Sequence, residues 1–127
     1  QIGLQFGPLI FMICVLGGLG NMIGGFIAAS LVDLDSGMTL GVRSSRPDFD
    51  LAAASAYNSE MVKMKLKTMR ALNINASLED MLLTLSDQIH LIRMVTPGTF
   101  LYLAADRSGT NLAIVRSVVG KYAATLA

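Results

Sequence analysis

The segment from Leu78 to Asp106 consists of three short strand-like runs separated by turn-forming residues, and the run over Gln88–Val95 alternates polar with apolar residues. Alternation with a period of two, interrupted by Gly and Pro, is typical of antiparallel strands with one buried face. The segment therefore predicts a three-stranded meander. The predicted strands are Met81–Leu85, Gln88–Val95 and Phe100–Ala105.

Two further segments have the apolar spacing of helices. The first begins after Asp48 or Asp50, either of which can cap it, and runs to about Leu72. Its apolar face is Val62, Leu66 and Met69, with Met61 and Met64 beside it. The second helix closes the chain, with one apolar face made by Leu112, Val115, Val119, Tyr122 and Leu126.

The N-terminal part predicts a short helix and a hairpin. We expect a helix over Leu9–Leu16, a loop or helix end over the glycine-rich Gly17–Gly25, and a buried strand over Phe26–Val32. Acids, Ser and Gly over Asp33–Gly37 predict a hairpin turn, after which Met38–Val42 returns as a strand.

The predicted order is helix, strand, strand, helix, three strands, helix. It indicates an α+β fold with one five-stranded antiparallel sheet. At 127 residues the chain is expected to form one domain. We expect an apolar N-terminal segment over residues 1–24 and the domain proper over residues 25–127.

Several stretches, in this order, resemble a known family between about Gly25 and Leu126. They are Ala28–Gly41, Leu51–Ala54, Lys65–Met69, Leu78–Leu85, His90–Arg93, Phe100–Ser108 and Asn111–Ala113. Together they look like the bacterial Roadblock/dynein light chain domain, whose profilin- or longin-like architecture has the element order predicted above.

The resemblance implies a dimer, either of this chain with itself or with a paralogous Roadblock protein. In it, third strands pair edge to edge and the crossover helices pack alongside. The residues expected at this interface are Met61, Met64, Met81, Leu82, Leu83, Thr84 and Leu85. The resemblance also implies a cytoplasmic, non-catalytic scaffold or regulator without a cofactor, which engages a Ras-like small GTPase or a larger motility or trafficking complex.

Charge and candidate chemistry narrow the classes of function. A net charge of +1 provides no basic field for nucleic acid. His90 has no second His, Cys or acid in ligand spacing, so we expect a hydrogen-bonded structural or surface histidine. Cys14 has no adjacent base and is expected to be an inert, buried thiol. Asp33 and Asp35 are expected to bond turn amides, so no catalytic or metal site is predicted.

The charge-free N-terminus supports an alternative function. Residues 1–32 contain no Asp, Glu, Lys, Arg or His, and the run over residues 7–32 exceeds the roughly 20 apolar residues of a membrane span. It contains the Gly20-x-x-x-Gly24 spacing of packed membrane helices, although the glycines and Asn21 make a poor helix. The alternative is a structural subunit of a large or membrane-associated assembly, held at the inner face of the membrane through this segment.

Basic residues gather on the crossover helix at Lys63, Lys65, Lys67 and Arg70. We expect a solvated helix face, with binding of an acidic partner as the minority alternative. A small-molecule sensor would need a polar-lined pocket, and no cluster of polar residues predicts one.

Overall fold

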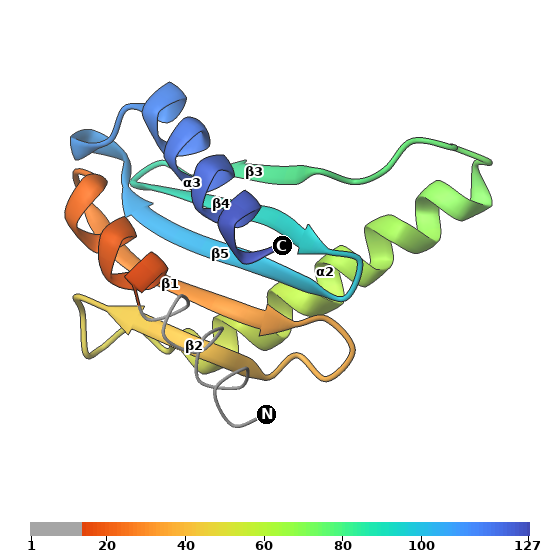
Figure 1. Cartoon of the computed structure of the whole chain (residues 1–127), viewed down its shortest axis with the longest axis horizontal. Coiled ribbons are helices and arrows are strands. Elements are labelled where there is room, and N and C mark those ends of the chain that lie inside the picture. Colours follow the sequence, from red (N-terminus) through yellow and green to blue (C-terminus); the bar gives the residue numbers. More distant parts are fainter. Residues whose placement is uncertain (1–13) are drawn as a thin grey trace.

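The computed structural model describes residues 14–127, so the start of the helix predicted over Leu9–Leu16 lies outside the described part of the chain. A five-stranded antiparallel sheet, in the order β2-β1-β5-β4-β3, has helices on both faces (Figure 1). The predicted element order and fold class are confirmed. After a helix over residues 14–22 the elements are β1 (Phe26–Asp33), β2 (Thr39–Ser44), α2 (Leu51–Ala71), β3 (Asp80–Thr84), β4 (Gln88–Thr96), β5 (Thr99–Asp106), the 3-10 turn η1 (Arg107–Gly109) and α3 (Leu112–Leu126).

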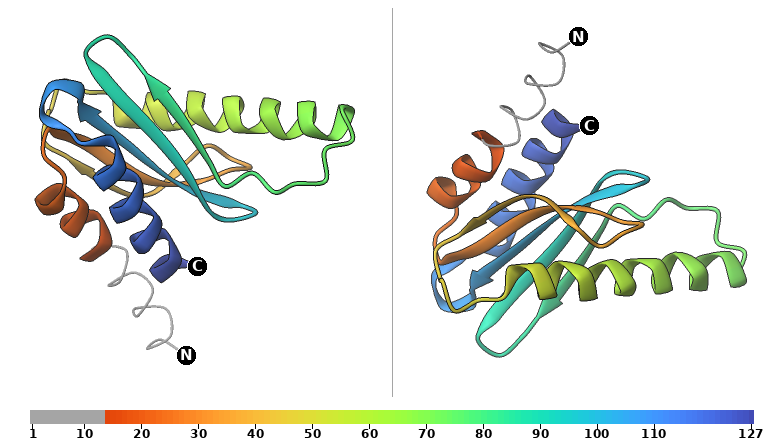
Figure 2. Two further views of the ribbon diagram at one scale, coloured as in Figure 1. Left: turned by 90° about the horizontal axis from the view of Figure 1, so that it is seen from above. Right: turned by 90° about the horizontal axis from the view of Figure 1, so that it is seen from below.

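The central strands β1 and β5 are buried along nearly their whole length because both of their faces are covered. Helix 14–22 and α3 cover one face, and α2 covers the other (Figure 2). A strand covered on both faces cannot alternate polar with apolar residues, which explains the almost continuous apolar sequences of these two strands. The outer strands β2 and β3 have no fully buried residue.

The first described helix runs through residue 22, so it continues past the predicted end at Leu16 and ends inside the Gly17–Gly25 segment, where a loop or helix end is expected. Packing overrides the low helix propensity of glycine. Val15, Leu16 and Leu19 are buried against the sheet and α3. A Cβ on Gly18 would lie 2.6 Å from the Tyr122 hydroxyl, so glycine permits this close approach.

The same packing changes the interpretation of the N-terminal segment. An added Cβ on Gly24 would lie 2.7 Å from the Gly109 carbonyl oxygen, so this glycine of the Gly20-x-x-x-Gly24 spacing serves a contact inside the chain. Cys14 is exposed rather than buried, because it lies on the helix face turned away from Val15, Leu16 and Leu19. Within residues 14–127 no helix has the length and hydropathy needed to cross a bilayer.

Helix α2 approaches the sheet closely through small polar side chains in its first half. Asp50 caps it, accepting a hydrogen bond from the Ala53 amide at 3.0 Å. The Ser55 hydroxyl lies 2.8 Å from that of Ser30 on β1, and the Ser59 hydroxyl donates to the Leu34 carbonyl at 2.5 Å. Both serines are fully buried, so hydrogen bonds rather than bulky side chains set the helix–sheet distance here.

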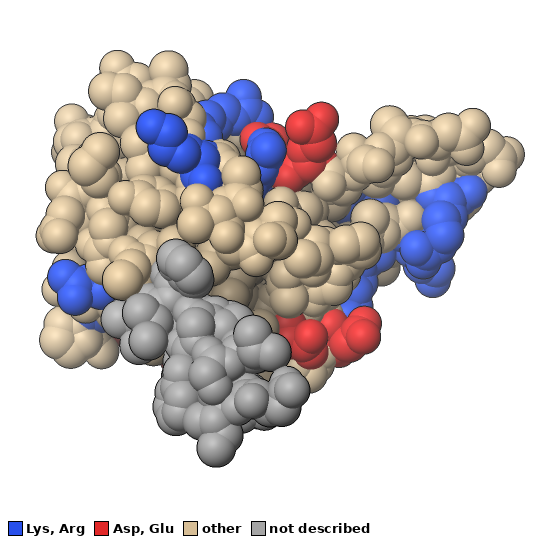
Figure 3. Space-filling model, in the orientation of Figure 1, with Lys and Arg blue, Asp and Glu red and all other residues tan. Residues whose placement is uncertain are grey.

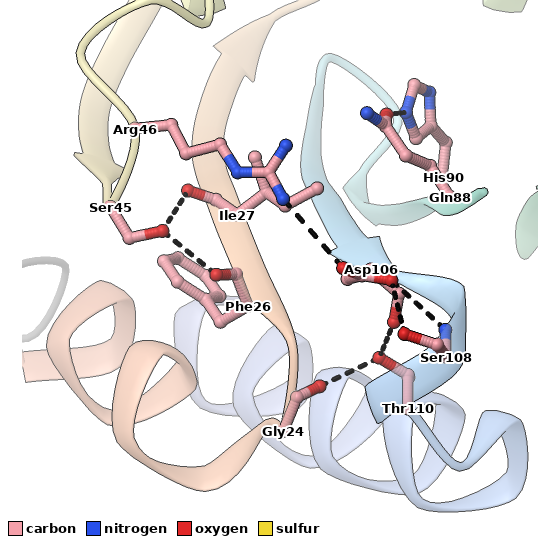
Figure 4. Close-up of polar contacts among 10 residues, drawn as sticks. All are labelled: Gly24, Phe26, Ile27, Ser45, Arg46, Gln88, His90, Asp106, Ser108 and Thr110. Atoms are coloured by element: carbon pink, nitrogen blue, oxygen red, sulfur yellow. Dashed lines mark hydrogen bonds and ion pairs between the residues drawn. The ribbon is translucent and has the colours of Figure 1, made fainter.

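A polar junction fastens the ends of four elements to one another (Figure 4). The Thr110 hydroxyl, just before α3, bonds the Gly24 and Asp106 carbonyls at 2.7 and 2.5 Å. After β2, the Ser45 hydroxyl donates to the Phe26 carbonyl at 2.9 Å, and Arg46 pairs with Asp106 at 3.9 Å. The junction therefore holds the start of β1 against the ends of β2 and β5.

Substitution of Gly25 by Ala should destabilise this junction. Gly25 has a φ of +74°, and an added Cβ would lie 2.8 Å from the Asp106 carbonyl oxygen. We expect Gly25→Ala to lower the free energy of unfolding by about 2 kcal/mol or more, measured by urea denaturation. The control is Gly98→Ala, whose Cβ would meet no atom within 4 Å. Equal stability of the two variants would contradict this role of Gly25.

Candidate dimerisation surface at β3 and α2

Strand β3 is an outer strand that pairs with β4 alone within residues 14–127. Two bonds flanking β3 fix the direction of its backbone groups: the Met94 amide donates to the Glu79 carbonyl at 2.9 Å, and the Leu85 amide donates to the Gln88 carbonyl at 2.8 Å. Residues along an antiparallel strand alternate between facing the neighbouring strand and facing away. The amides and carbonyls of Asp80, Leu82 and Thr84 therefore point to the free edge.

The three central side chains of β3 are apolar but incompletely covered. Met81 borders the core under α2, whereas Leu82 borders the core under α3. Leu83 is half-buried, Thr84 is exposed, and the neighbouring Leu85 is 43% exposed. An apolar edge with open backbone groups is a template for pairing with another strand.

Helix α2 contributes a second exposed feature. Met64 is 61% exposed, and Met61 is half-buried at the border of the same core as Met81. The structure thus brings Met61 and Met81, predicted from separate segments, to the same side of the sheet. Tyr57 is 77% exposed and lies on the same helix face, four residues before Met61. The helical spacing of Tyr57 to Met61 and Met64 could have identified Tyr57 from the sequence. We call Tyr57, Met61 and Met64 the α2 stripe.

Asp80 fixes the start of β3 in a way that sequence spacing does not reveal. Its carboxylate pairs with Arg93 on β4 at 3.8 Å and with Arg116 on α3 at 3.1 Å. These ion pairs hold the Asp80 carboxylate on the face of the sheet that α3 covers. They therefore fix the position of the first residue of β3. Acidic and basic side chains lie together near β3 in Figure 3.

His90 lies directly opposite Leu83 in the β3–β4 ladder. Its Nε2 lies 2.8 Å from Gln88 Oε1 (Figure 4), and its Nδ1 lies 3.3 Å from the Tyr102 hydroxyl. The prediction of a hydrogen-bonded structural histidine is confirmed. Burial lowers the pKa of His90 and raises the pKa of Tyr102 to about 12, so a neutral imidazole beside a protonated phenol is the stable arrangement.

The acids of the first hairpin play the structural part expected of them, in different ways. Asp33 accepts hydrogen bonds from the Ser36 hydroxyl at 2.7 Å and the Ser36 amide at 3.1 Å, which lower its pKa. For Asp35 the bond runs through the backbone, since its carbonyl accepts from Lys63 Nζ at 2.9 Å. Asp33 alone therefore fits the predicted bonding of a turn amide by a side chain.

A groove of about 390 Å³ lies between the second half of α2 and the β4–β5 turn. Its walls are mostly aliphatic and do not present the converging polar groups that fix a small ligand. Within residues 14–127, no three acidic, His or Cys side chains gather as a metal site. The lining residues are Leu66, Met69, Ala76, Ser77, Leu78, Met94, Val95, Thr96 and Pro97.

A five-stranded antiparallel sheet with this element order and helices on both faces is the architecture of Roadblock domains. No family model and no curated protein matches the chain. Among solved structures it is similar to a Roadblock/LC7 domain from Streptomyces avermitilis, with 16% identity, a TM-score of 0.78, and 88% of this chain and 91% of the other covered.

Two other solved structures agree. The gliding protein MglB from Thermus thermophilus has 15% identity and a TM-score of 0.82, with 94% of this chain and 87% of that chain covered. MglC from Myxococcus xanthus has 19% identity and a TM-score of 0.62, with 91% and 96% covered. The chain therefore has the Roadblock/LC7 fold.

The stability of the fold should depend on pH through His90. Because the pKa of His90 is lowered in the folded chain, the unfolded chain binds the proton more readily. The contribution of the neutral ring is fully present above the unfolded pKa of about 6.5 and is lost as the pH falls towards the lower folded pKa. We expect the melting temperature to fall between about pH 7 and pH 5, and to fall less in His90→Asn. Equal pH profiles for the two proteins would contradict this role.

Proposed function

We propose that this chain is a non-catalytic scaffold or regulatory protein that works as a dimer, with itself or with a paralogous Roadblock protein. The observation that carries the proposal is the apolar free edge of β3, together with the exposed α2 stripe, whose Met61 packs against the same core cluster as Met81 on β3. The interface that we propose consists of Met61 and Met64 on α2 and of Met81 to Leu85 on and just after β3.

A two-fold axis through Leu82 provides a register that uses every outward backbone group of β3. In it Leu82 pairs with the partner's Leu82, and Asp80 pairs with the partner's Thr84. An axis through Asp80 would instead place two carboxylates directly opposite each other, which is destabilising. The Leu82 register is therefore the one we propose.

The strands alone make a weak dimer. Hydrogen bonds between them contribute about 1 kcal/mol each, whereas association costs an estimated 4 kcal/mol or more in lost translational and rotational freedom. Burial of exposed large side chains supplies about 1.5–3 kcal/mol for each that is fully covered. The α2 stripe, with Tyr57 77% exposed and Met64 61% exposed, is available for that burial. We therefore propose that strand and helix contacts form together.

The partner that we propose for the dimer is a Ras-like small GTPase or a larger motility or trafficking complex in the cytoplasm. Support comes from the resemblance of the sequence and from proteins that share the fold. One is the gliding protein MglB from Thermus thermophilus, and another is MglB in a tetrameric arrangement. Regulation of a GTPase or its anchoring to an assembly is the function proposed, and catalysis by this chain is not part of it.

Replacement of Thr84 by Pro tests the β3 seam selectively. Thr84 is exposed and its amide points to the free edge, so Pro removes a donor to the partner strand without removing a bond to β4. We expect light scattering to give twice the 13.5 kDa chain mass for the wild type, and roughly 100-fold weaker association for Thr84→Pro. Thr84→Ala, which keeps the amide, should remain dimeric. A Thr84→Pro chain as dimeric as Thr84→Ala would rule out pairing through this edge.

Co-purification from the source organism tests the proposed partner. The wild-type chain should retain a Ras-like GTPase, or components of a motility or trafficking complex, identified by mass spectrometry. Retention of the GTPase should differ between GDP and a non-hydrolysable GTP analogue. The Thr84→Pro chain should retain less, because the partner is proposed to bind the dimer. Recovery of neither a GTPase nor any such component would count against this function.

A further inference from the structure

The second half of α2 and the connection after it carry positive charge only. Residues 61–78 contain Lys63, Lys65, Lys67 and Arg70 and no Asp or Glu. Lys63 is engaged by Glu60 at 3.4 Å and by the Asp35 carbonyl at 2.9 Å. The other three are exposed and have no ion-pair partner within residues 14–127. Figure 3 shows basic side chains on the far end of α2 with no acidic group beside them.

This end of α2 projects beyond the sheet (Figures 1 and 2), and its tip exposes aliphatic side chains. Leu72 is 65% exposed and Ile74 is 44% exposed. The chain at the tip forms an ordered turn, because the Ile74 amide donates a hydrogen bond to the Met69 carbonyl at 2.9 Å. Met69 is itself buried against the body of the protein. The tip therefore presents two aliphatic side chains in a fixed position, next to three uncompensated cations.

The convex shape of the tip and its chemistry favour a lipid surface over an acidic protein. A protein partner would need a concave, well-packed pocket of its own to receive Leu72 and Ile74, which stand out from the surface. A bilayer accepts projecting aliphatic groups at the level of its headgroups and acyl chains, and anionic lipids attract nearby Lys and Arg. The proposed dimer contacts α2 through Tyr57, Met61 and Met64, so the tip remains exposed in the dimer and free to contact a bilayer.

We propose that the projecting end of α2 docks on anionic lipid bilayers, with Leu72 and Ile74 entering the interface and Lys65, Lys67 and Arg70 contacting the headgroup phosphates. Each basic residue near an anionic surface strengthens binding about five-fold, so a single tip binds weakly and reversibly. A dimer carries two tips, which raises its apparent affinity when both reach the same surface. The proposal does not depend on the dimer, since one tip contains all of the groups involved.

Co-sedimentation with phosphatidylcholine vesicles, with and without phosphatidylserine, tests the electrostatic part. The full chain should sediment with the anionic vesicles, and raising the salt from about 0.1 M to about 1 M should release it. The double variant Lys67→Ala/Arg70→Ala should bind about 25-fold more weakly. The control Arg43→Ala/Lys121→Ala has the same net charge and alters two exposed residues outside the ion pairs of the described chain, so it should bind like the wild type. Equal binding to neutral vesicles, or equal loss in both variants, would overturn the proposal.

A single tryptophan locates the contact, because the chain has none of its own. Ile74→Trp should show a blue shift in its emission when phosphatidylserine vesicles are added. Ile114→Trp on α3, where the native side chain is 53% exposed, should not.

Vesicle binding without a shift at position 74 would show that another segment, such as the charge-free N-terminus, makes the contact, and would refute docking by α2. Absence of any vesicle binding would also refute it and would favour an acidic protein for the basic end. The double variant Ile74→Trp/Thr84→Pro should retain the shift while binding more weakly, which separates failure of the dimer from failure of the lipid site.

Discussion

The requirement that backbone amides and carbonyls be paired is the constraint from which the proposed function follows. A sheet covered by helices on both faces satisfies this requirement everywhere except at its two outer strands. In this chain those strands are β2 and β3. A register shift at Leu31/Val32 disturbs the β2 edge, which ends in Arg43 and Ser44, and such features discourage further pairing. The β3 edge has five residues in regular register and an apolar Met-Leu-Leu centre, so it is the edge suited to a second chain.

The charge-free N-terminus is accounted for in part by packing inside the protein. Between residues 15 and 23, four apolar side chains are buried in the core that α3 completes: Val15, Leu16, Leu19 and Ile23. Gly18 allows the Tyr122 ring to approach this helix, and Gly24 allows the Gly109 carbonyl to approach the chain, where a larger residue would collide. The buried apolar face of this helix and the glycine at position 18, beside Tyr122, therefore suit its packing against α3. The exposed Met22 and Cys14 show that the outer face of the helix is only partly polar.

Most elements could be predicted from the local sequence, because the spacing of apolar residues and the positions of turn-forming residues determine them. Turn residues separate the strands of the meander, and the apolar face of α2 through Val62 and Met69 is buried as its spacing indicates. The continuation of the first helix over residues 17–22 could not be predicted, since the helix packs against α3, about 100 residues further along the chain. The same holds for Asp80, whose partner Arg116 is 36 residues away. Tyr57 could have been found, because it continues the spacing of Met61 and Met64.

Hydrogen exchange at the individual amides of β3 tests the central claim most directly. The Met81 and Leu83 amides face β4 and should be protected in any oligomeric state, whereas those of Leu82 and Thr84 face outward. If β3 pairs with a second copy, Leu82 and Thr84 will be protected as strongly as Met81 and Leu83 at high protein concentration, and will lose protection on dilution. Rapid exchange at Leu82 and Thr84 at every concentration, beside protected neighbours, would show that the edge remains open and would contradict dimerisation through β3.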